Sequence, residues 1–231
     1  MSDIKITAAD LEKAAQRKLI AVTPKLYVGP FAATEKPDEF KGKVAWKLPL
    51  VADSVDEFNS FPTHFTSNAG LVDYSNALLD AFMEAEMAKA KGKSLADMKT
   101  ATIRRDLNAV DVYDEDGEKT GQVQINLKQN HEGKNKKGET FTIQIGVKQS
   151  DGKTNWTGGE LGKGSLVRAK LYLLPYYFAK DQEFGVSLGL KTVQVFEHVP
   201  AFGDGDDMSE FGEDAPMVDD ENDENDDMGD Y

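Results

Sequence analysis

Residues 164–178 read GSLVRAKLYLLPYYF, and their apolar side chains recur at every second position. On one side of an extended chain these residues are apolar: Val167, Ala169, Leu171 and Leu173. The other side carries Arg168, Lys170 and Tyr172. A period of two is typical of a β-strand with one buried face and one solvated face. Residues 183–199 predict a second long strand, joined to the first through residues 179–182.

Further β patterns lie before this pair of strands. Apolar and polar residues alternate in the segments 121–128 and 139–148, which predicts one half-buried strand in each. The Gly- and Lys-rich stretch 130–138 between them predicts a long hairpin finger. Residues 19–28 predict a bent or edge strand, and residues 42–51 predict another strand.

Helical patterns are fewer. In residues 68–91 the apolar side chains recur at three- and four-residue spacing, which predicts a helix that ends at Gly92. Residues 4–18 predict a short helix with Thr7 as its N-cap and Asp10 three positions later. Five or six strands with one internal helix predict a mainly β fold, a small and highly curved barrel in which the sheet closes on itself.

The acidic residues are unevenly distributed along the chain. The sequence has 27 Lys and Arg against 41 Asp and Glu, a formal net charge of −14. Residues 203–231 hold fourteen of the acidic residues and none of the basic ones, so residues 1–202 carry no net charge. A segment of this composition cannot bury enough apolar surface to offset its ordering entropy. We therefore expect one domain at 1–202 and a disordered acidic tail at 203–231.

Several kinds of chemistry find no support in the sequence. There is no Cys, which excludes disulfides, thiolate zinc sites and cysteine nucleophiles. The histidines have no second ligand at metal-binding spacing: His64, His131 and His198. Residues 158–165 lack the spacing of a phosphate-binding loop, and residues 111–117 lack the Gly of a calcium loop. We expect no metal, no cofactor and no enzymatic activity.

No apolar run resembles a signal peptide or reaches the length of a membrane span. We therefore expect a soluble, intracellular protein that is not associated with a membrane.

Aromatic and basic residues on β elements are the chemistry that the sequence does contain. A solvated face with Arg168, Lys170 and Tyr172 suits single-stranded nucleic acid, because bases stack on rings and phosphates meet cations. Further candidates for DNA contacts lie outside this strand: Lys128, Lys134, Lys136, Arg104, Arg105 and Trp156. Each has a plainer alternative, since rings at strand ends are often packed and lysine loops are often only solvated. Trp156 lies in a Gly- and Asn-rich loop, where an exposed ring would be hard to explain without a ligand.

Three segments resemble the single-stranded DNA-binding proteins of T7-like phages: GSLVRAKLYLLPY at 164–176, GVSLGL at 185–190 and AFG at 201–203. The internal helix, the Lys-rich hairpin and an acidic tail ending on an aromatic residue, here Tyr231, extend the resemblance. The resemblance covers most of the chain in the order of its elements, but the amino-acid sequence is closely similar only in residues 158–203.

The resemblance implies an oligonucleotide/oligosaccharide-binding (OB) fold, a five-stranded Greek-key barrel that coats single-stranded DNA in replication, recombination and repair. It implies that Tyr176 stacks on bases and that Phe178 is the aromatic two places later. The family carries Lys along the strand that matches residues 123–127, where this chain has Gln124 and Asn126, so that contact would move to Lys128.

The resemblance also implies partners for the tail. In the family the tail contacts the replicative DNA polymerase and the helicase–primase and supports a homodimer. The corresponding partner-binding residues here are Asp226, Asp227, Asp230 and Tyr231. The expected location is the cytoplasm of a bacterial host.

A neutral body that binds DNA must concentrate its cations in one groove, because phosphate neutralisation drives affinity. The tail would occupy that groove as a competing polyanion until DNA displaces it. A chaperone or interaction module for basic proteins, without a DNA site, is the main rival. A third alternative is an enzyme of nucleic-acid metabolism, which would need clustered metal-binding carboxylates in the body.

Overall fold

The computed structural model describes residues 4–63, 68–135 and 137–201. The predicted acidic tail at 203–231, with its partner-binding residues, lies outside the described residues, and so does Lys136. The division into domains at 202 and 203 stays a prediction.

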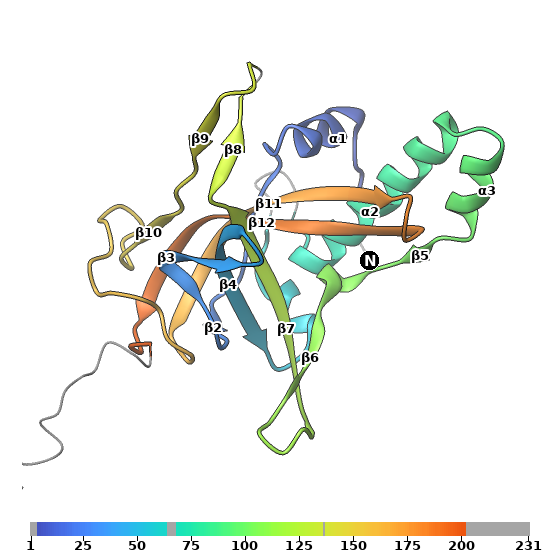
Figure 1. Cartoon of the computed structure of the whole chain (residues 1–231). Coiled ribbons are helices and arrows are strands. Elements are labelled where there is room, and N and C mark those ends of the chain that lie inside the picture. The colour runs from blue at the N-terminus through green and yellow to red at the C-terminus, as the bar shows by residue number, and fades with distance from the viewer. Residues whose placement is uncertain (1–3, 64–67, 136, 202–231) are drawn as a thin grey trace, which may run out of the picture. The chain divides into compact units, whose positions relative to one another are not determined.

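Five strands form a closed barrel (Figure 1). They are β2 (Leu26–Val28), β4 (Lys43–Ala52), β7 (Lys119–Asn130), β11 (Leu166–Phe178) and β12 (Glu183–Glu197). Around the barrel β11 pairs with β2, β2 with β4, β4 with β7, β7 with β12 and β12 again with β11. All of these pairs are antiparallel except β7 with β12, which are parallel and meet at one position, Lys128 with Gly189. This five-stranded Greek-key closure is the OB fold, which confirms the predicted fold class.

Shorter strands extend the sheet around the barrel. β1 (Ile20–Val22) adds to β11, β3 (Ala33–Phe40) to β4, and β6 (Val110–Tyr113) to β7. Two short strands, β5 (Thr102–Ile103) and β10 (Gly146–Lys148), run parallel to β12. A separate hairpin of β8 (Glu132–Lys134) and β9 (Thr140–Thr142) projects from the barrel (Figure 1). We call this hairpin the finger, and it confirms the hairpin predicted around residues 130–138.

Helices cover parts of the sheet. α1 (Ala8–Ala15) begins at Thr7, whose side chain and that of Asp10 form a reciprocal capping box, as predicted. α2 (Leu71–Lys89) is inserted between β4 and β7, and the β11–β12 hairpin packs against it (Figure 1). The elements not predicted are α3 (Lys93–Lys99), two short 3₁₀ turns (Val55–Asn59 and Asp106–Asn108), and the strands β3, β5 and β6.

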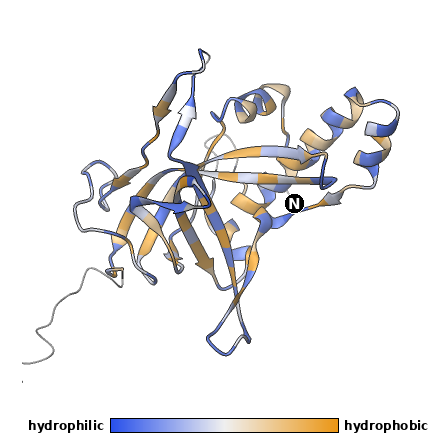
Figure 2. Ribbon diagram, viewed as in Figure 1, coloured by the Kyte–Doolittle hydropathy of each residue, from blue (hydrophilic) through white to orange (hydrophobic). Residues whose placement is uncertain are grey.

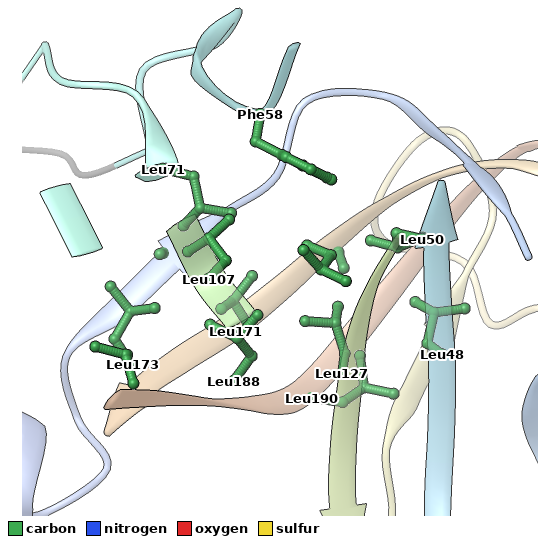
Figure 3. Packing of buried hydrophobic residues seen from close by; sticks show 14 of the residues in the cluster. Leu48, Leu50, Phe58, Leu71, Leu107, Leu127, Leu171, Leu173, Leu188 and Leu190 are labelled. Atoms are coloured by element: carbon green, nitrogen blue, oxygen red, sulfur yellow. The ribbon is translucent and has the colours of Figure 1, made fainter. Parts of the chain in front are cut away.

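Buried apolar residues alternate with exposed polar ones most clearly in β7, and Figure 2 shows hydrophobic and hydrophilic positions interspersed in the barrel strands. Leucines from four strands meet in one core: Leu48 and Leu50 of β4, Leu127 of β7, Leu171 and Leu173 of β11, and Leu188 and Leu190 of β12 (Figure 3). Phe58 and Leu71 close the core from the helical side. The core therefore fixes which side of each strand faces outward.

One predicted strand is wrong. Residues 139–148 do not form a single half-buried strand, because β9 ends at Thr142 and β10 begins at Gly146. β9 pairs only within the finger, where the Phe141 side chain is exposed, while β10 joins β12. Apolar residues do alternate along this segment, but β9 belongs to the finger and β10 belongs to the barrel sheet.

Candidate nucleic-acid interface

The outer face of the β11–β12 hairpin carries aromatic rings that lie across glycines. In the register of the two strands Tyr172 is opposite Gly189, and Tyr176 is opposite Gly185. A Cβ added at either glycine would overlap the facing ring. Glycine in a strand interior marks a close approach, and here it lets each ring lie against the backbone of the neighbouring strand.

Tyr172 lies in a cluster of cations. Its hydroxyl donates to Oε1 of Gln129 at 3.2 Å. The Arg17 guanidinium lies 5.6 Å and the Lys191 ammonium 6.0 Å from the ring centroid, within the range of cation–π attraction. Lys191 is the extra residue of a β-bulge, because Lys170 pairs with Thr192 and Leu171 with Leu190.

The expected exposure of Tyr172 is wrong. The side chain points away from the barrel core, on the same face as Arg168 and Lys170, but only 7% of it is exposed. The alternation of residues predicts to which side of the strand Tyr172 points. It does not predict that Arg17 and Gln129, which lie far away in the sequence, contact Tyr172 and help to bury it.

Tyr176 lies further along the same face. Its hydroxyl donates to Oε1 of Glu183 at 2.9 Å, and its ring centroid lies 4.3 Å from that of Phe178. Burial and the contact with Glu183 raise the pKa of Tyr176. The hydrogen bond from Arg104, at 2.5 Å, is the main reason that the pKa of Glu183 is lowered. Tyr176 is half-buried and Phe178 is 52% exposed, so both rings are partly open to a ligand.

Two adjacent cavities, which share lining residues, lie on this side of the barrel, and Tyr172 lines one of them. One, of about 250 Å³, lies between Asn108, Asn126 of β7 and the β12 segment 186–188. The other, of about 210 Å³, lies between Arg17, Tyr172 and the same part of β12. Lys128, Ser187 and Leu188 line both, so we call the two cavities together the central groove. The groove forms because β7 and β12 pair at one position and then diverge.

The groove is lined by uncompensated positive charge. Neither Arg17 nor Lys128 forms an ion pair with a described residue. Lys128 lies opposite Lys47 of β4, whose own ammonium pairs with Asp38. A third cavity, of about 380 Å³, shares Asn130 with the groove and leads to the base of the finger.

Other predicted contact residues lie beside the groove, lie elsewhere or have partners of their own. The Arg168 guanidinium stacks on Phe61, 4.3 Å from its centroid, and Arg105 pairs with Asp80 at 2.5 Å. Lys170 is exposed on the outer face of β11, and Lys134 lies on the finger, which the third cavity reaches only at its base.

The ring of Trp156, another predicted contact residue, is half-buried. Its Nε1 donates to the Gly159 carbonyl at 2.9 Å, and its ring packs edge-on against His198 at 5.0 Å. The half-buried ring also packs against the barrel core. Its loop is therefore explained by packing without a ligand.

Sequence reasoning missed Arg17, Lys191, Asn108 and Gln129. Arg17 follows α1, Lys191 is a bulge, and Asn108 lies in a turn, so no periodic pattern marks these three. Gln129 lies in β7, one residue beyond the segment predicted as a strand. The glycines at 185 and 189 did carry a signal, because glycine repeated within a long strand indicates a close approach.

The described residues contain no group of three or more His, Asp or Glu placed to hold a metal ion. Among the same residues, no helix combines the length and the apolar character that crossing a membrane requires.

The closed barrel and its aromatic and cationic groove define an OB-fold protein with the features of an oligonucleotide-binding surface. Among solved structures the fold is similar to that of gp2.5, a single-stranded DNA-binding protein encoded by bacteriophage T7. That similarity has a TM-score of 0.58 at 20% sequence identity, and covers 86% of this chain and 97% of that one. The resemblance predicted from the sequence is thus confirmed at the level of the fold.

Weaker likenesses involve the single-stranded DNA-binding protein of bacteriophage Enc34. Its complex with single-stranded DNA has a TM-score of 0.40 at 10% identity, covering 80% of this chain and 89% of that one. Similarity at this level carries no argument about function. No protein-family model and no curated protein matches the chain.

Proposed function

We propose that this protein binds single-stranded DNA without sequence preference, with the strand lying in the central groove. The main observation behind this proposal is that the rings of Tyr172 and Tyr176 lie against the outer face of the β11–β12 hairpin. The groove on this side also contains Arg17 and Lys128, which have no ion-pair partner among the described residues. Bases would stack on the open side of Tyr176, and phosphates would meet the cations. The fold shared with gp2.5 supports the same function.

The proposed binding has a defined salt dependence. Arg17, Lys128, Lys170 and Lys191 would each neutralise one phosphate at or beside the groove. Single-stranded DNA contributes a slope of about −0.7 per phosphate contact, so log K against log salt should fall with a slope of about −3.

The test is a titration of labelled oligo-dT, and of a duplex of equal length, by fluorescence anisotropy at several salt concentrations. We expect tighter binding to the single strand, and a shallower salt slope for Lys128→Gln. Lys93→Gln on α3, outside the groove, removes the same charge and should leave the slope unchanged. Absence of binding to both DNAs would instead favour the chaperone for basic proteins, and equal binding to both would contradict a preference for single strands.

The wider role belongs to the same proposal. The protein would coat single-stranded DNA in phage replication, recombination and repair, in the cytoplasm of a bacterial host, and would act by binding without catalysis. The acidic tail would compete for the groove, recruit the replicative polymerase and the helicase–primase, and support a homodimer. The support for these roles is the charge segregation in the sequence and the family resemblance.

A further inference from the structure

The loop between β2 and β3 presents an aromatic ring that the described residues leave almost uncovered. Phe31 is 90% exposed, and its backbone φ is 63°. A left-handed conformation is an outlier for a bulky side chain, and such strain persists only where the surroundings impose it. Both features are unfavourable for folding alone, so they call for a functional reason.

The loop is held on both sides of Phe31. Before it, the Gly29 N–H donates to the Pro49 carbonyl at 3.0 Å. After it, the carboxylate of Glu160 accepts from the Thr34 N–H at 2.6 Å and the Glu35 N–H at 2.8 Å. The ring is therefore presented from a fixed backbone, and a ligand that stacks on it would not have to order the loop.

A row of side chains connects this loop to the central groove. Lys128 and Asn126 line the groove on the outer face of β7, and Gln124 follows on the same face. Gln124 donates to Oδ1 of Asn126 at 3.0 Å. Gly29 lies over the end of this row, because a Cβ there would be 2.7 Å from Oε1 of Gln124. From Lys128 to Gln124 the strand rises about 13 Å, which a few nucleotides can span.

A second ring lies at the same end of the row. Tyr27 on β2 is 56% exposed and pairs in register with Val51, which pairs with Gln124. Tyr27 and Phe31 thus flank Gly29, whose small size lets the chain pass close over β4.

We propose that Phe31, with Tyr27 beside it, is a second base-stacking platform for the strand that leaves the central groove along β7. This inference rests on the proposed function. The occupant is single-stranded DNA because the row leading to the rings carries amides and a lysine, which suit a polar strand with stackable bases. At this platform the chain would hold DNA mainly by stacking, since Gln124 and Asn126 bring no charge.

The experiment compares two oligo-dT lengths, one that fills only the groove and one several nucleotides longer. Phe31→Asn removes the ring, and Asn adopts the left-handed conformation readily. We expect Phe31→Asn to weaken binding of the longer oligonucleotide about fivefold to a hundredfold, the range for one lost stack. The short oligonucleotide should bind as before, the salt slope should not change, and Phe31→Trp should restore affinity.

Tyr113→Ala is the matched control, because Tyr113 is an exposed ring at the end of β6, opposite Lys119 of β7 and beyond the row that ends at Gln124. Wild-type affinity of Phe31→Asn for both lengths would overturn the inference, and so would a change in sedimentation without a change in DNA binding, which would indicate a contact between copies. Failure of the wild-type protein to bind either oligonucleotide would instead overturn the proposed function. If Lys128→Gln weakens binding and Phe31→Asn does not, the result contradicts the second platform but not the proposed function.

Discussion

At the residue scale, neighbouring tyrosines in β11 have opposite environments. Tyr176 lies on the outer face across Gly185, while the next ring, Tyr177, stacks on buried Phe184 with centroids 4.5 Å apart. Phe184 in turn meets Phe82 of α2 edge-on at 6.3 Å. One ring is therefore available to a ligand, and its neighbour supports the hairpin.

This difference separates binding from stability. We expect Tyr176→Ala to weaken binding of oligo-dT by about 1–3 kcal/mol, the contribution of one stacked base, with little change in melting temperature. Tyr177→Ala should lower the free energy of unfolding by about 2–3 kcal/mol, because it empties a packed site. Anisotropy titrations and urea denaturation of both variants check this. A large loss of stability in Tyr176→Ala would place that ring among the supporting residues.

A buried tyrosine in α2 makes the stability of the folded state fall at high pH. Burial, aided by the charge of Asp10, raises the pKa of Tyr74 from 10.0 to about 12. The folded protein therefore keeps the phenol protonated where the unfolded chain releases its proton. The stabilisation is complete below about pH 10 and is lost as the pH rises toward 12.

We expect the melting temperature of the wild-type protein to fall more steeply between pH 10 and 12 than that of Tyr74→Phe, which has no proton to release. Lysines titrate in the same interval, so the difference between the two proteins is the quantity to measure. Parallel curves would contradict the expectation.

The sequence predicted which face of a strand each side chain occupies better than it predicted how far that side chain is buried. Arg168, Lys170 and Tyr172 share the outer face of β11 as expected, because side chains alternate along any strand. Burial depends on residues that are distant in the sequence and that the fold places in contact, such as Arg17 over Tyr172 and His198 beside Trp156. The DNA contacts assigned to these residues stay predictions.

At the scale of elements, prediction succeeded where one local signal decides the structure. Thr7 with Asp10 forms the capping box of α1, and the helix at 71–89 follows from its apolar spacing. The strands that were missed are short and are defined by their pairing: β3 pairs with β4, β6 with β7, and β5 with the distant β12. The break between β9 and β10 was missed because these two strands belong to different sheets.

β3 also depends on a carboxylate far away in the sequence. Glu160 accepts hydrogen bonds from the backbone N–H groups of Thr34, Glu35 and Lys36, at the start of that strand. We expect Glu160→Ala to lower the free energy of unfolding by about 2 kcal/mol, since hydrogen bonds to charged groups are the stronger ones. Urea denaturation measures this, with Glu35→Ala, an exposed side chain, as the control. Equal stability of the two variants would mean that the sheet alone holds β3.

At the scale of the whole molecule, the balance of charge is the dominant feature. Residues 1–202 are neutral, and the full net charge of −14 belongs to residues 203–231. Under the proposed function the groove would attract DNA despite a neutral body, because Arg17 and Lys128 lie together in it without described carboxylate partners. A polyanionic segment of the same chain would compete for these cations.

We expect deletion of residues 203–231 to strengthen binding of oligo-dT, most clearly at low salt, where charges are least screened. Replacing the fourteen acidic residues of the tail by their amides keeps its length and is the matched control, with the same expected effect. Titration of the three proteins at two salt concentrations tests this. Unchanged or weaker binding after deletion would exclude competition by the tail.

The sequence by itself determined the barrel strands 42–51, 121–128, 164–178 and 183–199, the inserted helix and the segregation of charge, because each is written in the local order of residue types. Only the tertiary structure decided which residues meet. The central groove exists because β7 and β12 touch at Lys128 and Gly189 and then separate, and that pairing joins residues 61 positions apart. Periodicity fixes which way a side chain points, but closure of the barrel decides what it faces.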